Sequence, residues 1–391
     1  MPAITRHCGE SSSVPEAATY YCLRARQPSV RFLRIRQGRA GFWPLAPAAL
    51  WHAVCYHSAL KELTRGWTVR TLAGALLIIL AMSITNAREI DMRVFQINDH
   101  LVCFYDGRPA EASHRSGTDS WADSGAFNVG VATYAIHRGD TALVYDTYPT
   151  TQDAQWVRNY LTRSGIRHFT VVNSHWHLDH VGGNAVYADV DRIATTKTIQ
   201  RLAAKKSAIE AGTEWGPPAI KPLVIPNIGI ERDTNYYVGD IKVELRPVNI
   251  HSADGLVIYL PGDRVLLAGD TLEDTVTFVS EPEQLAEHYR NLQTLKLWNI
   301  SRILPNHGNP DVISRGGYRA TLIDATQEYL RKLILRAHDT NYLSGTLEDY
   351  VGDSVEKGWV SMWWAYRDAH ETNLKRVAKA LRDRPLPQLP K

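Results

Sequence analysis

Cysteine is scarce in this chain, and the positions of the few that occur exclude two common kinds of site. Only four are present in 391 residues: Cys8, Cys22, Cys55 and Cys103. No two of them form a C-x-x-C pair, so the sequence contains neither a cysteine zinc site nor a disulfide framework. If the N-terminal region is removed, Cys103 is left alone and cannot form an intrachain disulfide.

Charge imbalance and long apolar runs are also lacking. The formal net charge is +3 at pH 7, which is too small to indicate binding to nucleic acid or to a membrane surface. The main apolar run, residues 72–82, is shorter than the roughly 20 residues that a membrane-spanning helix needs. No Gly-rich phosphate loop follows a predicted strand and no G-x-S-x-G elbow occurs, which excludes the usual nucleotide and serine-hydrolase motifs.

The N-terminal region differs from the rest of the chain. Residues 1–66 are rich in arginine and poor in acid. We interpret them as an upstream stretch that is absent from the mature protein; the alternative is a functional basic extension. Residues 67–87 resemble a signal peptide, because a basic flank and the apolar run lead to the small residue Ala87. We therefore expect export to a bacterial periplasm, with an uncleaved inner-membrane anchor as the alternative.

Four metal-ligand candidates lie close together in residues 171–184: His175, His177, Asp179 and His180. They follow a short apolar run, residues 169–172, which predicts a buried strand. His175 and His177 are two positions apart, so both side chains point to one side of an extended segment. Imidazole and carboxylate groups suit Zn²⁺ and related divalent metals. The stretch therefore predicts a metal site on a loop that leaves a strand end.

This H-x-H-x-D-H pattern resembles that of the metallo-β-lactamase superfamily. The family has three further ligands downstream, in the order His, Asp and His. The chain offers candidates in that order, each after a short apolar run: His251, Asp270 and His307. The resemblance covers about residues 90–335.

The resemblance implies a centre of two zinc ions with a bridging hydroxide. The first ion would be held by three histidines, His175, His177 and His251. The second would be held by Asp179, His180 and His307, and Asp270 would bridge both. Asp179 is also the candidate catalytic side chain, because it can orient the hydroxide. The resemblance further suggests that Asp146 supports the metal loop; the alternative is an ordinary turn residue.

The function implied is that of an exported zinc hydrolase, which uses the hydroxide to attack a small ester, lactone, thioester or amide. Asp270 stands where the best-known zinc β-lactamases carry Cys or Ser. A β-lactam is therefore a less favoured substrate than the other compounds of this group, although it is not excluded. The alternative is a mononuclear iron-dependent oxidoreductase on the same fold, similar to persulfide dioxygenases. We expect a small-molecule substrate, no nucleic acid, and no stable membrane partner unless the N-terminal segment is uncleaved. The sequence does not indicate an oligomeric state.

The predicted fold is α/β, an αββα sandwich over residues 88–335 with a C-terminal helical extension over residues 336–391. Apolar alternation predicts strands, and helical periodicity predicts helices, over the segments given next. The strands are 92–105, 128–136, 141–145, 169–172, 236–248, 255–260, 264–268 and 303–304, and the helices are 151–164, 195–210, 282–298, 317–335 and 346–381.

Two aromatic features of the sequence lie outside these core strands. Trp215 belongs to the loop-like segment 211–235 and either lines a substrate cleft or lies on the surface. Trp359, Trp363 and Trp364 suggest an aromatic stripe on the last predicted helix, which we expect to pack against the sandwich.

Overall fold

The computed structural model describes residues 90–112, 120–382 and 384–389. The predictions for residues 1–66 and for the signal-like segment 67–87 lie outside these ranges. Cleavage and export therefore stay predictions. Within the described ranges, no helix combines the length and the apolar character needed to cross a membrane.

The larger of two β-sheets has seven strands, which lie in chain order from β1 to β7. The pairs from β1 to β4 are antiparallel, and those from β4 to β7 are parallel. The strands are β1 (Arg93–Asn98), β2 (Leu101–Asp106), β3 (Val131–Arg138), β4 (Thr141–Tyr145), β5 (His168–Val172), β6 (Asp191–Thr195) and β7 (Ile228–Ile230).

The smaller sheet has five strands in the order β12-β11-β10-β9-β8. All of its pairs are antiparallel except β11 with β12, which is parallel. Its strands are β8 (Thr234–Val238), β9 (Ile241–Val248), β10 (Gly255–Leu260), β11 (Val265–Gly269) and β12 (Arg302–Pro305).

The two faces of the larger sheet pack into two different apolar cores. In β2, Leu101, Cys103 and Tyr105 join a cluster that also contains the strands of the smaller sheet. Val102 and Phe104 point the other way, into a cluster formed with helix α3 (Thr151–Arg163). Because successive side chains of a strand point to opposite faces, the larger sheet lies between helices and the second sheet.

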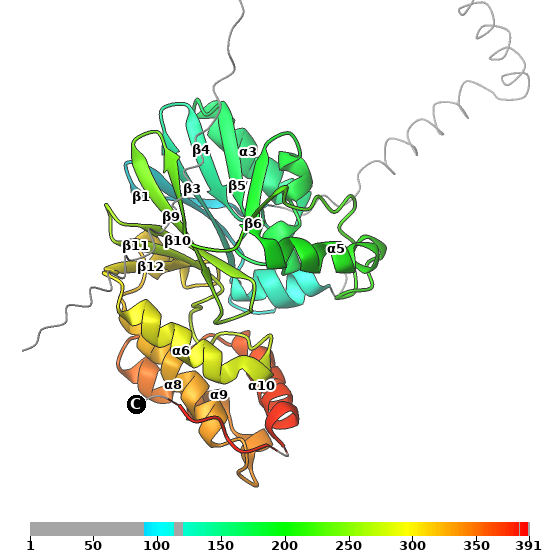
Figure 1. Ribbon diagram of the computed structural model, residues 1–391, viewed down its shortest axis with the longest axis vertical. Helices are drawn as coiled ribbons and strands as arrows, with labels where there is room; N and C mark the ends of the chain where they lie inside the picture. Colours follow the sequence, from blue (N-terminus) through cyan, green and yellow to red (C-terminus); the bar gives the residue numbers. More distant parts are fainter. Residues whose placement is uncertain (1–89, 113–119, 383, 390–391) are drawn as a thin grey trace, which may run out of the picture. The chain divides into compact units, whose positions relative to one another are not determined.

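The remaining helices complete the layers. In Figure 1, α6, α8, α9 and α10 gather together, and their buried side chains belong to the cluster shared by the two sheets. This arrangement confirms the predicted αββα class with helices at the C-terminal end. The α-helices are α4 (Leu178–Val181), α5 (Thr196–Ala211), α6 (Leu285–Lys296), α7 (Pro310–Ser314), α8 (Thr321–Leu335), α9 (Leu347–Glu356) and α10 (Tyr366–Leu381). The other helical segments are the π-helix η1 (Ala122–Phe127) and the 3₁₀ turns η2 (Asn184–Tyr187), η3 (Pro282–Gln284) and η4 (Tyr342–Ser344).

Capping residues explain why the two predicted helices of the first half begin where they do. The Thr150 hydroxyl accepts a hydrogen bond from the backbone N–H of Asp153 at 3.2 Å, and α3 begins at the next residue. Thr195 caps α5 in the same way through the N–H of Thr198. A capping hydroxyl satisfies a donor that has no partner within the helix, which favours a helix start at that point.

Several strands differ from the prediction. Residues 92–105 form a hairpin of β1 and β2 instead of one strand, and residues 236–248 likewise form β8 and β9. Apolar alternation continues across both tight turns, so periodicity alone could not place them. Strands β6 and β7 were not predicted, because β6 carries charged residues at its start and β7 is only three residues long.

The prediction of one C-terminal helix with an aromatic stripe was wrong, because residues 346–381 form two helices, α9 and α10. Helix α9 ends two residues before Gly358, which adopts a left-handed φ of 66° that glycine reaches without strain. Trp363 and Trp364 therefore lie in the connection between α9 and α10. Packing against the sandwich was correct: the indole N–H of Trp363 donates to Asn128 O at 2.8 Å, and that of Trp364 to Pro109 O at 3.3 Å.

Gly183 offers a test of how closely the metal loop packs on the strand ends. A Cβ there would lie 2.1 Å from Thr147 O and 2.3 Å from Ala154 Cβ. We expect Gly183→Ala to destabilise the fold by about 1–3 kcal/mol through overpacking, measured by thermal or denaturant unfolding. Gly262→Ala is the control, because no neighbouring atom lies within 4 Å of the position that its methyl group would take. Equal stability of both variants would contradict the close approach.

Candidate metal centre

The candidate ligands follow the carboxyl ends of four strands. His175 to His180 follow β5, His251 follows β9, Asp270 comes directly after β11, and His307 comes after β12. Loops at strand ends can present polar side chains while the sheet holds their positions. The chain fold therefore brings segments from both sheets to one point.

The loop after β5 is held against the sheet by its two glycines. Asp179 and His180 lie in the single turn of the short helix α4, and His177 is its N-terminal cap. A Cβ at Gly182 would lie 2.0 Å from Pro149 O, so a side chain there would push the loop away from the segment after β4. The glycines thus allow the close approach that positions the histidines.

The structure brings all seven predicted side chains together, in two groups that share one residue. The first group is His175, His177, His251 and Asp270; the second is Asp179, His180, Asp270 and His307. Within each group, one donor atom per residue lies within 4.8 Å of the others, and all seven residues are buried. Only the described residues enter this grouping. The role of these side chains as ligands stays a prediction, but their placement agrees with it.

Three of the histidines have one ring nitrogen bonded away from the centre. His180 Nδ1 donates to Asp146 Oδ2 at 2.9 Å, and His307 Nδ1 donates to Gly130 O at 2.5 Å. His175 Nδ1 lies 2.9 Å from the hydroxyl of the adjacent Ser174. In each case, Nε2 is the nitrogen left to face the other donors. Such outer hydrogen bonds orient the ring and select the tautomer that can bind a metal.

The other two histidines are oriented in different ways. His251 Nδ1 lies 3.4 Å from both Thr277 Oγ1 and Glu273 Oε1, which leaves its Nε2 for the centre. His177 is reversed: its Nε2 lies 3.2 Å from Ser280 Oγ, and its Nδ1 faces His251 Nε2 at 3.1 Å. His177 thus offers Nδ1 where the others offer Nε2.

Asp146 connects the loops that carry the ligands. Its Oδ1 accepts from the backbone N–H of Ser174 at 2.7 Å, and its Oδ2 accepts from Asn306 Nδ2 at 2.6 Å as well as from His180. The residue has a φ of 66°, a conformation that Asp tolerates better than most residues. Of the two interpretations of Asp146, support of the metal loop is the one that these contacts favour.

The protonation states of the cluster follow from its burial and its charges. Burial, together with the neighbouring histidines, holds the pKa of His175 and His177 well below the usual value. Burial also acts to lower the pKa of His180 and His307, but the nearby carboxylates outweigh it and raise the pKa well above the usual value. Since metal ligation needs neutral imidazoles, metal binding would displace protons from His180 and His307.

Two buried polar atoms of the cluster have no hydrogen-bond partner among the described residues: His175 Nε2 and Asp270 Oδ1. His175 Nε2 lies 3.7 Å from Asp270 Oδ2, which is too far for a hydrogen bond. An unpartnered buried donor or acceptor costs free energy, so a native protein normally satisfies it. A divalent cation bound by both residues would satisfy both atoms, so the residues present fit a metal.

An aromatic surface lies beside His177. The Trp215 ring centroid is 5.0 Å from that of His177, 5.7 Å from that of Trp176 and 5.8 Å from that of Trp121. The Phe278 ring also lies near His177, at 6.5 Å between centroids. Trp215 remains 37% exposed, so this aromatic surface is open to solvent next to the ligands. Trp215 therefore lies on the surface and next to a candidate ligand at the same time; that it lines a substrate cleft stays a prediction.

Three supporting residues were not predicted from the sequence. Asp254 is buried and accepts from the backbone N–H of Trp176 at 3.0 Å, while Glu273 faces His251 and Asn306 bonds to Asp146. Each lies within three positions of a predicted ligand. Polar residues close to a ligand in the chain were therefore the available signal, although nothing local identifies their partners.

Comparison with known proteins agrees with this geometry. A family model described as "Metallo-beta-lactamase superfamily" matches residues 127–300. Within this segment, the chain is similar to the metallo-β-lactamase superfamily. Members of that superfamily are typically metal-dependent hydrolases.

Individual relatives are distant. The chain is 26% identical over 265 residues to the Caenorhabditis elegans protein "Beta-lactamase-like protein 2 homolog", a match that spans 64% of this chain and 78% of the relative. Among solved structures, it is similar to a metallo-beta-lactamase from Pontibacter korlensis, with a TM-score of 0.47, 17% identity, and coverage of 62% of this chain and 99% of the other. It is also similar to the DIM-1 metallo-beta-lactamase, with a TM-score of 0.46, 18% identity, and coverage of 62% and 99%.

The role of Asp146 can be tested by changing its charge alone. We expect Asp146→Asn to lower metal affinity by about 10- to 100-fold, because the amide no longer accepts as strongly from His180 and Ser174. Asn also tolerates the positive φ, so the backbone should be unaffected. Competition with a chromogenic chelator measures the affinity. Asp140→Asn, in an exposed turn, is the matched control, and an equal effect of both changes would contradict the assignment.

Proposed function

We propose that this protein is a hydrolase with a two-metal centre that cleaves a small ester, lactone, thioester or amide. One observation carries the proposal: two buried donor groups share Asp270, so one carboxylate can contact two cations. A mononuclear iron site would use only one of these groups and would leave the other without a cation. Zinc is the metal we propose, since histidine and aspartate donors suit it and the hydrolases of this superfamily typically use it.

The metal and Asp179 would have different roles in hydrolysis. Bound zinc would lower the pKa of a coordinated water and polarise the substrate carbonyl. Burial acts to raise the pKa of Asp179, but His180 and His307 hold it well below the usual value. The carboxylate is therefore anionic at neutral pH and can accept a hydrogen bond from the attacking water. We assign Asp179 the task of orienting that water.

The metal and the reaction class can be tested in one experiment on protein that starts at Arg88. We expect about two zinc ions per chain, and turnover of at least one of four substrates: nitrocefin, an acyl-homoserine lactone, a thioester and a p-nitrophenyl ester. A chelator should abolish turnover, and added zinc should restore it. One iron per chain, with oxygen consumed and none of the four substrates hydrolysed, would contradict the proposal and favour the iron-dependent oxidoreductase.

The same assay tests Asp179 against a surface carboxylate. Asp179→Asn should reduce kcat by about 100-fold or more if the carboxylate orients the water. Asp240→Asn is the control, because this aspartate is 76% exposed and pairs with Arg138 on the surface. Equal kcat values in the two variants would show that Asp179 does not orient the attacking water.

The aromatic surface beside His177 predicts a preference among substrates. An aromatic or apolar acyl group can pack on Trp215, and such a contact is worth roughly 0.5–1.5 kcal/mol. We expect Trp215→Ala to raise KM by about 2- to 10-fold for a phenylacetyl ester while it leaves the acetyl ester unchanged.

Tyr237→Ala is the matched control for Trp215→Ala, because Tyr237 is a similarly exposed aromatic residue on β8. A KM that shifts equally for both esters would show that Trp215 does not select the substrate.

A further inference from the structure

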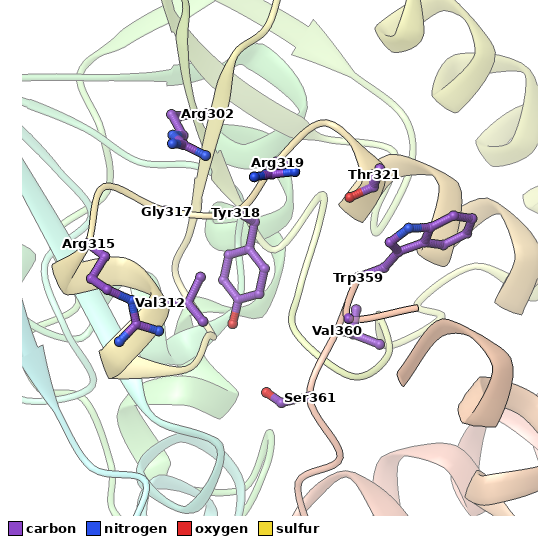
Figure 2. A pocket seen from close by; sticks show the side chains of 11 residues that line it. Arg302, Val312, Arg315, Gly317, Tyr318, Arg319, Thr321, Trp359, Val360 and Ser361 are labelled. Carbon is purple, nitrogen blue, oxygen red and sulfur yellow. The ribbon is translucent and has the colours of Figure 1, made fainter. Parts of the chain in front are cut away.

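A second concave site lies apart from the metal ligands. Figure 2 shows this pocket, which has a volume of ≈ 420 Å³. The start of β12, the connection from α7 to α8, and the connection from α9 to α10 line it, with side chains that include Arg302, Arg315, Tyr318, Arg319, Trp359 and Ser361. None of the seven candidate metal ligands is among its lining residues.

The pocket has an excess of positive charge. Three arginines line it, and no lining residue is acidic. Within the described part of the chain, Arg302, Arg315 and Arg319 have no ion-pair partner, whereas Arg108 pairs with Asp274 and Arg201 pairs with both Asp254 and Glu281. Like charges around one cavity repel each other, so the arrangement favours an anion between them.

Backbone pairing explains why two of the arginines are close. Ile303 and Tyr318 form an antiparallel bridge, with reciprocal N–H to O bonds of 2.8 Å. In antiparallel pairing, the residue before Ile303 faces the residue after Tyr318, so Arg302 lies opposite Arg319, as Figure 2 shows. Like charges directly opposite each other are destabilising. The bridge therefore brings the two arginine side chains to neighbouring positions, where a bound anion would offset their repulsion.

The turn before this bridge positions the third arginine. Gly317 has a φ of 92°, and a Cβ there would lie 2.4 Å from Ile303 O. The tight turn at Gly316 and Gly317 joins Arg315 to the bridge, and the wall of the pocket is therefore built on ordered backbone.

We propose that this pocket binds a phosphate-bearing small molecule. Guanidinium groups bind phosphate through paired hydrogen bonds, and a phosphate monoester carries about −1.5 to −2 charges at neutral pH. Three arginines match that charge better than they match a single carboxylate. The volume lies within the roughly 300–1,000 Å³ typical of small-molecule sites, and Trp359 provides apolar surface for the organic part of a phosphate ester.

The pocket is joined to the loops of the metal centre through two of its lining residues. The Tyr318 hydroxyl accepts from the backbone N–H of Asn309 at 2.7 Å, two residues after His307. The backbone N–H of Ser361 donates to Asp274 Oδ1 at 2.8 Å, and the N–H of Asp274 donates to His307 O at 3.0 Å. A ligand in the pocket thus contacts residues that hold the His307 loop.

Calorimetric titration of the zinc-loaded chain tests the proposal. The probes are inorganic phosphate, adenosine monophosphate, glucose 6-phosphate and, as the uncharged control, adenosine. We expect saturable binding of at least one phosphate compound and none of adenosine. Because phosphate can also bind zinc, the titration is repeated after chelation, and binding should persist. The strongest probe distinguishes the free anion from an ester as the ligand.

Charge-neutral variants locate the binding. The double variant Arg302→Gln, Arg319→Gln should lower the affinity for the phosphate probe by about ten-fold or more. Arg331→Gln is the matched control, because Arg331 is exposed on α8 outside the pocket, and it should bind as the wild type does. The proposal is overturned if no phosphate probe binds, if binding disappears on chelation, or if the double variant and the control bind equally. These results do not depend on turnover, so they stand whatever reaction the metal centre performs.

Discussion

One buried carboxylate links the two sheets at the place where the candidate ligands meet. Asp146 follows β4, and its oxygens accept hydrogen bonds from Ser174 after β5 and from Asn306 after β12. The same side chain accepts from His180. Removing a carboxylate from water is costly unless hydrogen bonds replace its hydration, and here the replacements come from both halves of the sandwich. The relative placement of β5 and β12, and hence of His180 and His307, depends on these bonds.

The cluster that Asp146 supports combines carboxylates with histidines whose pKa these carboxylates raise. His180 and His307 lie within 3.1–3.3 Å of Asp270 Oδ2, where charge pairs can form. Bound cations would replace the protons of these pairs, so metal affinity should be linked to both pH and folding stability. The centre is thus formed by the packing of the sandwich, while the two unpartnered atoms of His175 and Asp270 remain for a cation.

The loop that carries His307 is held from two directions. On one side, His307 donates to Gly130 O and faces Asp179 and Asp270. On the other, Asn309 and Asp274 connect it to the residues that line the arginine pocket. The aromatic surface at His177 adjoins the other group of ligands. The arginine pocket and the aromatic surface therefore approach the centre through different ligands, which allows binding at one to be separated from binding at the other.

The sequence by itself predicted the set of candidate donors and determined the αββα class and most helix starts. The donors could be predicted because four of them fall within six positions and the others follow short apolar runs, and the helix starts because capping threonines act within one turn. The turns between β1 and β2, between β8 and β9, and at Gly358 were not predicted. The apolar pattern continues across each of these turns, so it does not reveal where the turn lies. Only the tertiary structure decided which nitrogen of each histidine faces the centre, that Trp215 lies beside His177, and that Arg302 lies opposite Arg319. The reason is physical: these features depend on contacts between residues far apart in the chain, and the local pattern around each residue carries no information about its distant partner.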